Sequence, residues 1–122
     1  MEDKSAVQRY TVHDPKMIQL YSAATPNGLK VAACLEEICD LRRETDSFEY
    51  EPHTVNIRQG ECRLPDFKLS VNPNGKIPAI IDPTTDPANP LNVFESGSIL
   101  LYLSEKYEVW YFTFNTITTQ LI

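Results

Sequence analysis

The feature that most constrains the fold is a short apolar run followed at once by a helix start. Residues 17–21 (MIQLY) predict a buried strand, and Thr25-Pro26-Asn27-Gly28 comes directly after it. The Thr25 hydroxyl is suited to accept a bond from a first-turn N–H, and Pro26 suits the first helical position. An apolar stripe at helical spacing follows, made of Val31, Cys34, Leu35 and Ile38. We expect this helix to end near Asp40.

The middle of the chain predicts a second strand and a short helix. Residues 50–57 hold Val55 and Ile57 in alternation, and Pro52 favours an edge position because proline cannot donate to a ladder. Residues 58–65 are a polar loop. Residues 66–71 are suited to one or two helical turns.

The last part predicts a turn, a hairpin and a strong helix. Residues 72–75 (NPNG) form the turn, and residues 79–82 and 91–94 are two strands close enough to pair antiparallel. Residues 95–107 carry an apolar helical stripe of Ile99, Leu100, Leu103 and Tyr107. The order is β-α-β-α-β-β-α, and its first three elements predict a parallel pair joined by a right-handed crossover. We therefore expect an α/β fold with a mixed four-stranded sheet.

The bulk composition excludes several classes of function. The chain has 122 residues, which suits one domain, and a formal net charge of −6, which argues against a generic nucleic-acid binder. No stretch is apolar enough for a signal peptide or a membrane span, so we expect a cytoplasmic protein without a membrane partner. The three cysteines contain no CxxC pair, and His13 and His53 are isolated. We therefore expect reduced thiols and no bound metal.

Three motifs in order resemble the N-terminal, thioredoxin-like domain of glutathione transferases. They are TPNG before a helix carrying LEE, then NPNGKIPAIID, then VFESGSILLYLSEKY. The closest pattern is the nu-class and nitrogen-regulator-like branch, in which Thr-Pro-Asn-Gly replaces the usual Tyr, Ser or Cys signature. The resemblance covers about residues 16–107. It implies that glutathione binds at the loop ends of the sheet and that full-length relatives form dimers.

Glu95 and Ser96 match the family positions for the γ-glutamyl end of glutathione. A helix start offers unpaired N–H groups and the positive end of a dipole, which together with the Ser96 hydroxyl suit a carboxylate. The Glu95 carboxylate suits an ammonium group. The structural alternative is that Ser96 only caps the helix and Glu95 only complements its dipole.

The resemblance also implies a role for Ile77 and Pro78. In the family this proline is cis, and the preceding residue presents its backbone to the cysteinyl part of the tripeptide. An ordinary trans strand start is the alternative. Lys76 is suited to the glycine carboxylate or is a solvated turn lysine. Cys62 stands where the family usually has a glutamine for the glycine end, and is either an inert thiol or a redox-active one.

TPNG supplies the candidate catalytic groups. A helix start stabilises a thiolate, and the Thr25 hydroxyl and Asn27 amide are suited to donate hydrogen bonds to the glutathione sulfur and lower its pKa. Both match the sulfur-contacting positions of the branch. Ser22 is the rival hydroxyl, because it lies nearer the end of the strand.

We divide the chain into an N-terminal arm (1–15), a glutathione-binding domain (16–107) and a β-prone tail (108–122). The tail matches no transferase linker. Family members continue into an all-helical second domain, which we expect to be missing here. We therefore expect a truncated or alternatively spliced product, with a partner-binding tail as the alternative. The open outer face of the 99–107 helix then predicts self-association.

These observations support three functional hypotheses. The first is a glutathione transferase or a glutathione-dependent disulfide reductase, acting on a small electrophile or a disulfide. The second is an inactive glutathione-binding fragment. The third is a regulatory interaction module of the same fold.

Overall fold

A mixed four-stranded sheet forms the centre of the molecule in the computed structural model, which describes residues 10–109. Its strands are β1 (Ile18–Ser22), β2 (Tyr50–Thr54), β3 (Ala79–Asp82) and β4 (Leu91–Phe94), in the order β2-β1-β3-β4. β1 and β2 are parallel, while β3 is antiparallel to both β1 and β4. This arrangement confirms the predicted α/β fold and its element order.

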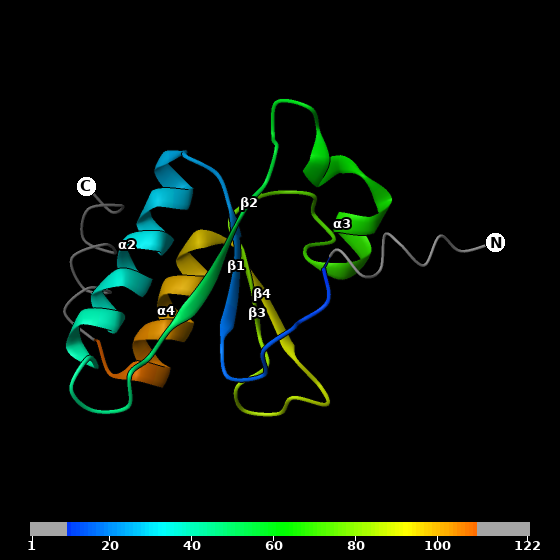
Figure 1. Cartoon of the computed structure of the whole chain (residues 1–122). Helices are drawn as coiled ribbons and strands as arrows, with labels where there is room; N and C mark the ends of the chain where they lie inside the picture. The colour runs from blue at the N-terminus through cyan, green and yellow to red at the C-terminus, as the bar shows by residue number, and fades with distance from the viewer. Residues whose placement is uncertain (1–9, 110–122) are drawn as a thin grey trace.

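The helices cover the sheet on both faces (Figure 1). α2 (Pro26–Leu41) and α4 (Ser96–Tyr107) lie side by side on one face, and α3 (Pro65–Ser70) lies on the other. A 3-10 turn, η1 (Glu61–Arg63), precedes α3 within the predicted polar loop. The parallel β1–β2 pair requires a crossover, and α2 supplies it.

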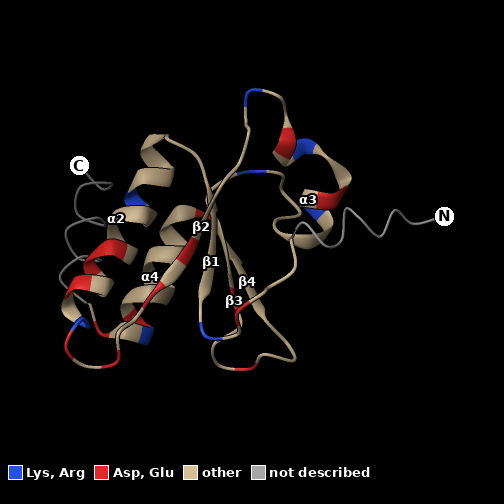
Figure 2. Ribbon diagram, in the orientation of Figure 1, with Lys and Arg blue, Asp and Glu red and all other residues tan. Residues whose placement is uncertain are grey.

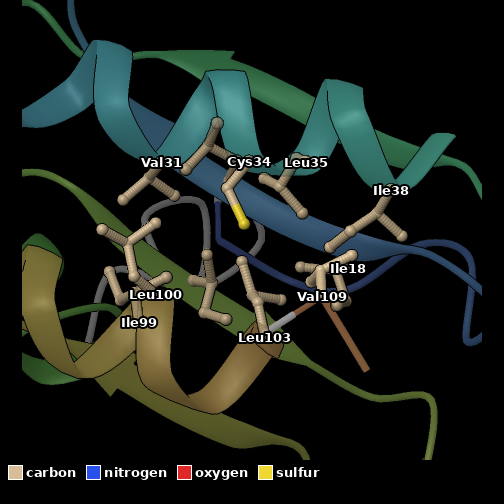
Figure 3. Close-up of a cluster of buried hydrophobic side chains, with 11 residues drawn as sticks. Ile18, Val31, Cys34, Leu35, Ile38, Ile99, Leu100, Leu103 and Val109 are labelled. Carbon is tan, nitrogen blue, oxygen red and sulfur yellow. The ribbon is translucent and has the colours of Figure 1, made fainter. Parts of the chain in front are cut away.

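Alternation along β1 divides the core into two clusters. Ile18 and Leu20 face α2 and α4, whereas Tyr21 faces the α3 side. Figure 3 shows the first cluster, in which the predicted stripes of α2 and α4 meet over the sheet. The second cluster is richer in aromatic residues and consists of Tyr10, Tyr21, Val55, Phe67, Val71, Ala79 and Ile81.

The second strand is shorter than predicted. β2 ends at Thr54, and Ile57 lies in the following turn with an exposed side chain. Val55 still donates its N–H to the Ser22 carbonyl at 2.8 Å and is buried. The chain therefore leaves the sheet one residue after β2, and the apolar alternation that predicted a strand to Ile57 reflects burial of Val55 alone.

Packed residues extend beyond both predicted domain limits. Tyr10, assigned above to the arm, and Val109, assigned to the tail, are 6% and 5% exposed. Val109 joins the α2/α4 cluster, as Figure 3 shows. The rest of the predicted arm up to residue 9 and of the tail from residue 110 lies outside the described residues.

The outer face of α4 is mixed rather than apolar. Ile99, Leu100 and Leu103 are buried against the sheet and α2. Leu101 is the one large apolar side chain that α4 exposes. Self-association through this face stays a prediction, and within α4 its apolar contribution rests on Leu101.

A buried carboxylate anchors the C-terminal half of α4 to the sheet. Asp82, at the end of β3, accepts hydrogen bonds from Lys106 Nζ (2.6 Å), from the N–H and hydroxyl of Thr84, and from the Tyr102 hydroxyl. Burial alone raises the pKa of the Asp82 carboxyl, but these hydrogen bonds more than offset it and hold the pKa below its ordinary value. The network fixes the end of α4 that lies far from its N-terminus.

Candidate functional site

The strand register brings the sequence-predicted site residues to one edge of the sheet. Tyr21 in β1 pairs with Ala79 in β3, and Ala79 pairs with Phe94 in β4. The residues just beyond these three partners are therefore neighbours at the same edge. They are Ser22 as the last residue of β1, Ile77 and Pro78 before β3, and Glu95 and Ser96 after β4.

The start of α2 is a closed and tightly packed turn. Thr25 is the N-cap, as predicted, and its Oγ1 accepts a hydrogen bond from the Gly28 N–H at 3.1 Å. A Cβ on Gly28 would lie 2.2 Å from the Ala23 carbonyl oxygen and 2.4 Å from Ser22 Oγ. Only glycine therefore allows the turn between β1 and α2 to approach the first turn of the helix. Asn27 is exposed at the second helical position.

The two hydroxyl candidates differ in how their hydrogen-bonding capacity is used. The Thr25 oxygen accepts a bond from Gly28, so its proton is still available to a ligand. Ser22 instead donates its hydroxyl proton to the Ala23 carbonyl at 3.4 Å. This difference favours Thr25 as the donor to a bound sulfur.

Tyr21 is not a candidate for thiol activation although it lies at the end of β1. It is 2% exposed, and its hydroxyl has no hydrogen-bond partner in the described part of the chain. Burial, with a smaller contribution from Glu51, raises the pKa of Tyr21 to about 12. A phenol held this far inside the core is poorly placed to donate to a solvent-exposed ligand.

The Ile77–Pro78 peptide bond is cis, as the family resemblance implied. The turn before it is held by Asn72, which is buried. The Asn72 side chain donates to the Lys76 carbonyl at 2.9 Å and accepts from the Asn74 N–H at 2.9 Å. The sequence predicted only a turn at Asn72, and its Asn-Pro-Asn-Gly setting was the available signal for this role.

The start of α4 excludes a capping role for Ser96. The N-cap is Glu95, whereas Ser96 is the first helical residue, so Ser96 does not cap the helix. No described side chain makes a capping bond there. Glu95 has a φ of 69°, which is uncommon for a residue with a Cβ and is often a sign of a functional constraint. The first-turn N–H groups therefore point to the edge without a side-chain acceptor.

A depression lies beside Ile77 on the α3 side of the sheet. Its lining includes three cationic side chains, those of Arg63, Lys68 and Lys76, and also Cys62. Figure 2 shows basic residues interspersed with acidic ones around η1 and α3, whereas a run of acidic residues occupies the second half of α2. Cys62 is a half-buried free thiol in this cationic setting. The depression can therefore accept a carboxylate.

The described residues include no group of three or more His, Cys, Asp and Glu side chains placed to hold a metal ion. Within residues 10–109, no helix is long and apolar enough to cross a membrane.

Comparison with known proteins identifies the family. The family model for the glutathione S-transferase N-terminal domain matches residues 18–105. The chain therefore belongs to the glutathione S-transferase family and carries its N-terminal, thioredoxin-like domain.

Individual relatives agree with this assignment. The chain is 49% identical over 90 residues to the disulfide-bond oxidoreductase YghU of Escherichia coli, covering 74% of this chain and 30% of that protein. It is 42% identical over 84 residues to the transcriptional regulator URE2 of Saccharomyces cerevisiae, covering 69% of this chain and 20% of that protein.

A solved structure is similar over most of the chain. It is a glutathione transferase family member from Pseudomonas fluorescens with two glutathione bound, 46% identical, with a TM-score of 0.68. The match covers 84% of this chain and 42% of that one. The chain spans about a third of the length of the curated relatives it matches.

Proposed function

We propose that this chain binds glutathione along the edge of the sheet that carries the α2 and α4 starts. The observation that supports this most is the register. It pairs Tyr21, Ala79 and Phe94 across three neighbouring strands, and Ser22, Pro78 and Glu95 adjoin these residues at the same end. Strands lie about 4.8 Å apart, so β1 to β4 across β3 spans about 10 Å. An extended tripeptide has a length of about 10 Å. The edge therefore matches the ligand in size.

The γ-glutamyl end of glutathione is assigned to the start of α4. The uncapped N–H groups and the Ser96 hydroxyl suit its carboxylate, and the exposed Glu95 carboxylate suits its ammonium group. The positive φ of Glu95 supports this assignment, because strained residues cluster where a ligand is held.

The cysteinyl part is assigned to the Ile77 backbone, which lies just outside the β3 ladder. A peptide bound there adds to the sheet as an extra strand segment would. The glycine carboxylate then reaches the depression and its cations, Arg63, Lys68 and Lys76. A cysteine thiol donates hydrogen bonds more weakly than the glutamine amide that the family usually has at the position of Cys62. The attraction for the glycine carboxylate therefore comes from the three cations.

The sulfur is assigned to the start of α2. The Thr25 hydroxyl proton and the Asn27 amide are both suited to donate hydrogen bonds to a thiolate. The positive end of the helix dipole also stabilises the negative charge of the thiolate. Each charge-assisted bond contributes roughly 1.5–3 kcal/mol, so one such bond lowers the thiol pKa by about one to two units. More of the glutathione is then thiolate at neutral pH.

The activity we propose for the whole protein is glutathione-dependent disulfide reduction or glutathione conjugation. In the first, the thiolate attacks one sulfur of a disulfide, forming a mixed disulfide and releasing the other sulfur as a thiolate. In the second, it attacks a small electrophile. YghU, named as a disulfide-bond oxidoreductase, favours the first. The same proposal includes dimerisation of the whole protein. It also includes a cytoplasmic location, in agreement with the three free thiols.

The test is retention of the 122-residue chain on immobilised glutathione, followed by two assays. One assay uses a chloroaromatic electrophile and the other a mixed disulfide of glutathione. We expect retention and elution by free glutathione. Absence of retention would overturn the proposal, and retention without turnover in both assays would select the alternatives of an inactive fragment or a regulatory module.

Thr25→Ala tests the role of the hydroxyl. We expect turnover to fall at least tenfold while retention changes little, because the hydroxyl acts on the charged sulfur. The fold should lose about 1 kcal/mol with the cap. Thr25→Ser is the matched control and should keep most of the turnover. Equal loss of turnover and retention would make Thr25 only a structural cap, and a larger loss for Ser22→Ala would assign the role to Ser22.

A further inference from the structure

Tyr10 is buried although it lies before β1 and outside the region that the family model matches, residues 18–105. Its ring meets Tyr21 edge-on with centroids 5.6 Å apart and Phe67 with centroids 5.8 Å apart. These contacts place it in the cluster beneath α3. The chain before β1 is thus held against the α3 side of the sheet at this residue.

The Tyr10 hydroxyl connects this residue to the loop between β2 and α3. It donates to Glu61 Oε2 at 3.1 Å across 51 positions of sequence. Glu61 Oε1 accepts from the Asn56 N–H at 3.1 Å, and the Glu61 N–H donates to the Asn56 carbonyl at 3.0 Å. One carboxylate therefore joins Tyr10 to both ends of the 56–61 loop.

This loop carries one wall of the cationic depression. Cys62 and Arg63 follow Glu61 directly and line the depression with Lys76 and Ile77. The wall packs closely against the opposite side, because a Cβ on Gly75 would lie 2.8 Å from the Cys62 carbonyl oxygen. A shift of Glu61 would therefore move the Arg63 side of the depression relative to the Lys76 side.

We propose that Tyr10 is a positioning residue for the glycine end of glutathione and that it acts through Glu61. The inference rests on the proposed function, since it assigns the depression to the glycine carboxylate. Tyr10 does not touch the ligand. Its hydroxyl holds the Glu61 carboxylate, the carboxylate holds the loop, and the loop sets the distance between Arg63 and Lys76.

The test compares two ligands, glutathione and γ-glutamylcysteine, which lacks the glycine, by calorimetric titration of the full chain. Tyr10→Phe removes the hydroxyl and keeps the ring contacts, so the variant should fold. We expect its affinity for glutathione to fall about fivefold, the effect of one hydrogen bond, and its affinity for γ-glutamylcysteine to change less than twofold. A loss of core stability alone would not distinguish the two ligands.

Two further variants make the test specific. Tyr50→Phe removes a similar hydroxyl that donates to Glu36 between β2 and α2, away from the depression, and should change neither affinity. In a Glu61→Ala background, Tyr10→Phe should have no further effect on glutathione binding.

Three results would overturn the inference. They are equal loss for both ligands, no loss in Tyr10→Phe, and a Tyr10→Phe effect that persists without Glu61. If the unsubstituted chain binds neither ligand, the proposed function fails first and the inference fails with it. Binding of both ligands with no response to Tyr10→Phe overturns the inference alone.

Discussion

The starts of α2 and α4 lie at the same edge of the sheet but are built in opposite ways. Thr25 caps α2 and occupies one of its first-turn N–H groups, and Gly28 packs against the preceding turn. At α4 no capping bond is present among the described residues, Glu95 has a positive φ, and a Cβ on Gly97 would meet nothing within 4 Å. One helix start is closed on itself, and the other is open.

We infer that the two helix starts, although both serve ligand binding, contribute differently to the stability of the fold. The α2 start is stable without a ligand and offers only a hydroxyl proton and an exposed amide. The α4 start leaves its donors free, which costs stability at that end. The Asp82 network anchors the other end of α4 and compensates for this. The contacts at the C-terminal end of α4 therefore offset the stability that its uncapped N-terminal end lacks.

The largest expected effect contrasts the two glycines. Gly28→Ala should destabilise the chain by about 3 kcal/mol or more, because the new Cβ would overlap the Ala23 carbonyl oxygen and Ser22 Oγ. Gly97→Ala should stabilise it by about 0.5 kcal/mol, because the methyl group meets open space and alanine favours the helix. Urea unfolding of both variants measures the difference. Similar effects at the two positions would contradict the contrast between a closed and an open start.

The next effect concerns the anchor of α4 and depends on pH. Because the folded pKa of Asp82 is depressed, its contribution to stability is present above the unfolded value of about 3.9 and is lost as pH falls through the folded pKa. Asp82→Asn should cost about 2 kcal/mol at pH 7, the contribution of hydrogen bonds to a charged group. Thermal unfolding should show this difference shrinking as pH falls below about 4. A difference that stays constant down to pH 2 would exclude the ion pair as its cause.

The smallest effects on the fold are expected at Glu95. Glu95→Gln should weaken glutathione binding about tenfold to a hundredfold with unchanged stability, since it removes the charge that faces the ammonium group. Glu95→Gly should weaken binding as much and stabilise the fold by about 1 kcal/mol, because glycine relieves the positive φ. Calorimetry and urea unfolding measure the two quantities. A destabilised Glu95→Gly variant would mean that the backbone is not strained there.

Sequence reasoning succeeded where local signals agree with the tertiary structure. The Thr25 cap and the Val31–Ile38 stripe predicted α2, and β3 and β4 were predicted to the residue because the proline-rich 83–90 loop separates them and Pro78 precedes β3. The cis bond at Pro78 was expected only from the family resemblance.

The remaining features depend on contacts between distant segments. The close approach at Gly28 exists only once the β1–α2 turn folds back, and the positive φ of Glu95 has no local sequence signature. Tyr10 lies in a polar stretch without apolar periodicity, so its burial could not be predicted from spacing. The depression beside Lys76 likewise combines residues from three separate segments.

The most direct test of the central claim is an amide NMR titration of the chain with glutathione. If glutathione binds along the edge between the two helix starts, the amide signals of Gly28, Ile77 and Ser96 should shift together with one dissociation constant. The signals of residues 84–89, in the β3–β4 loop at the opposite end of the sheet, should stay in place. Shifts confined to that loop, or no shifts at millimolar glutathione, would contradict the account.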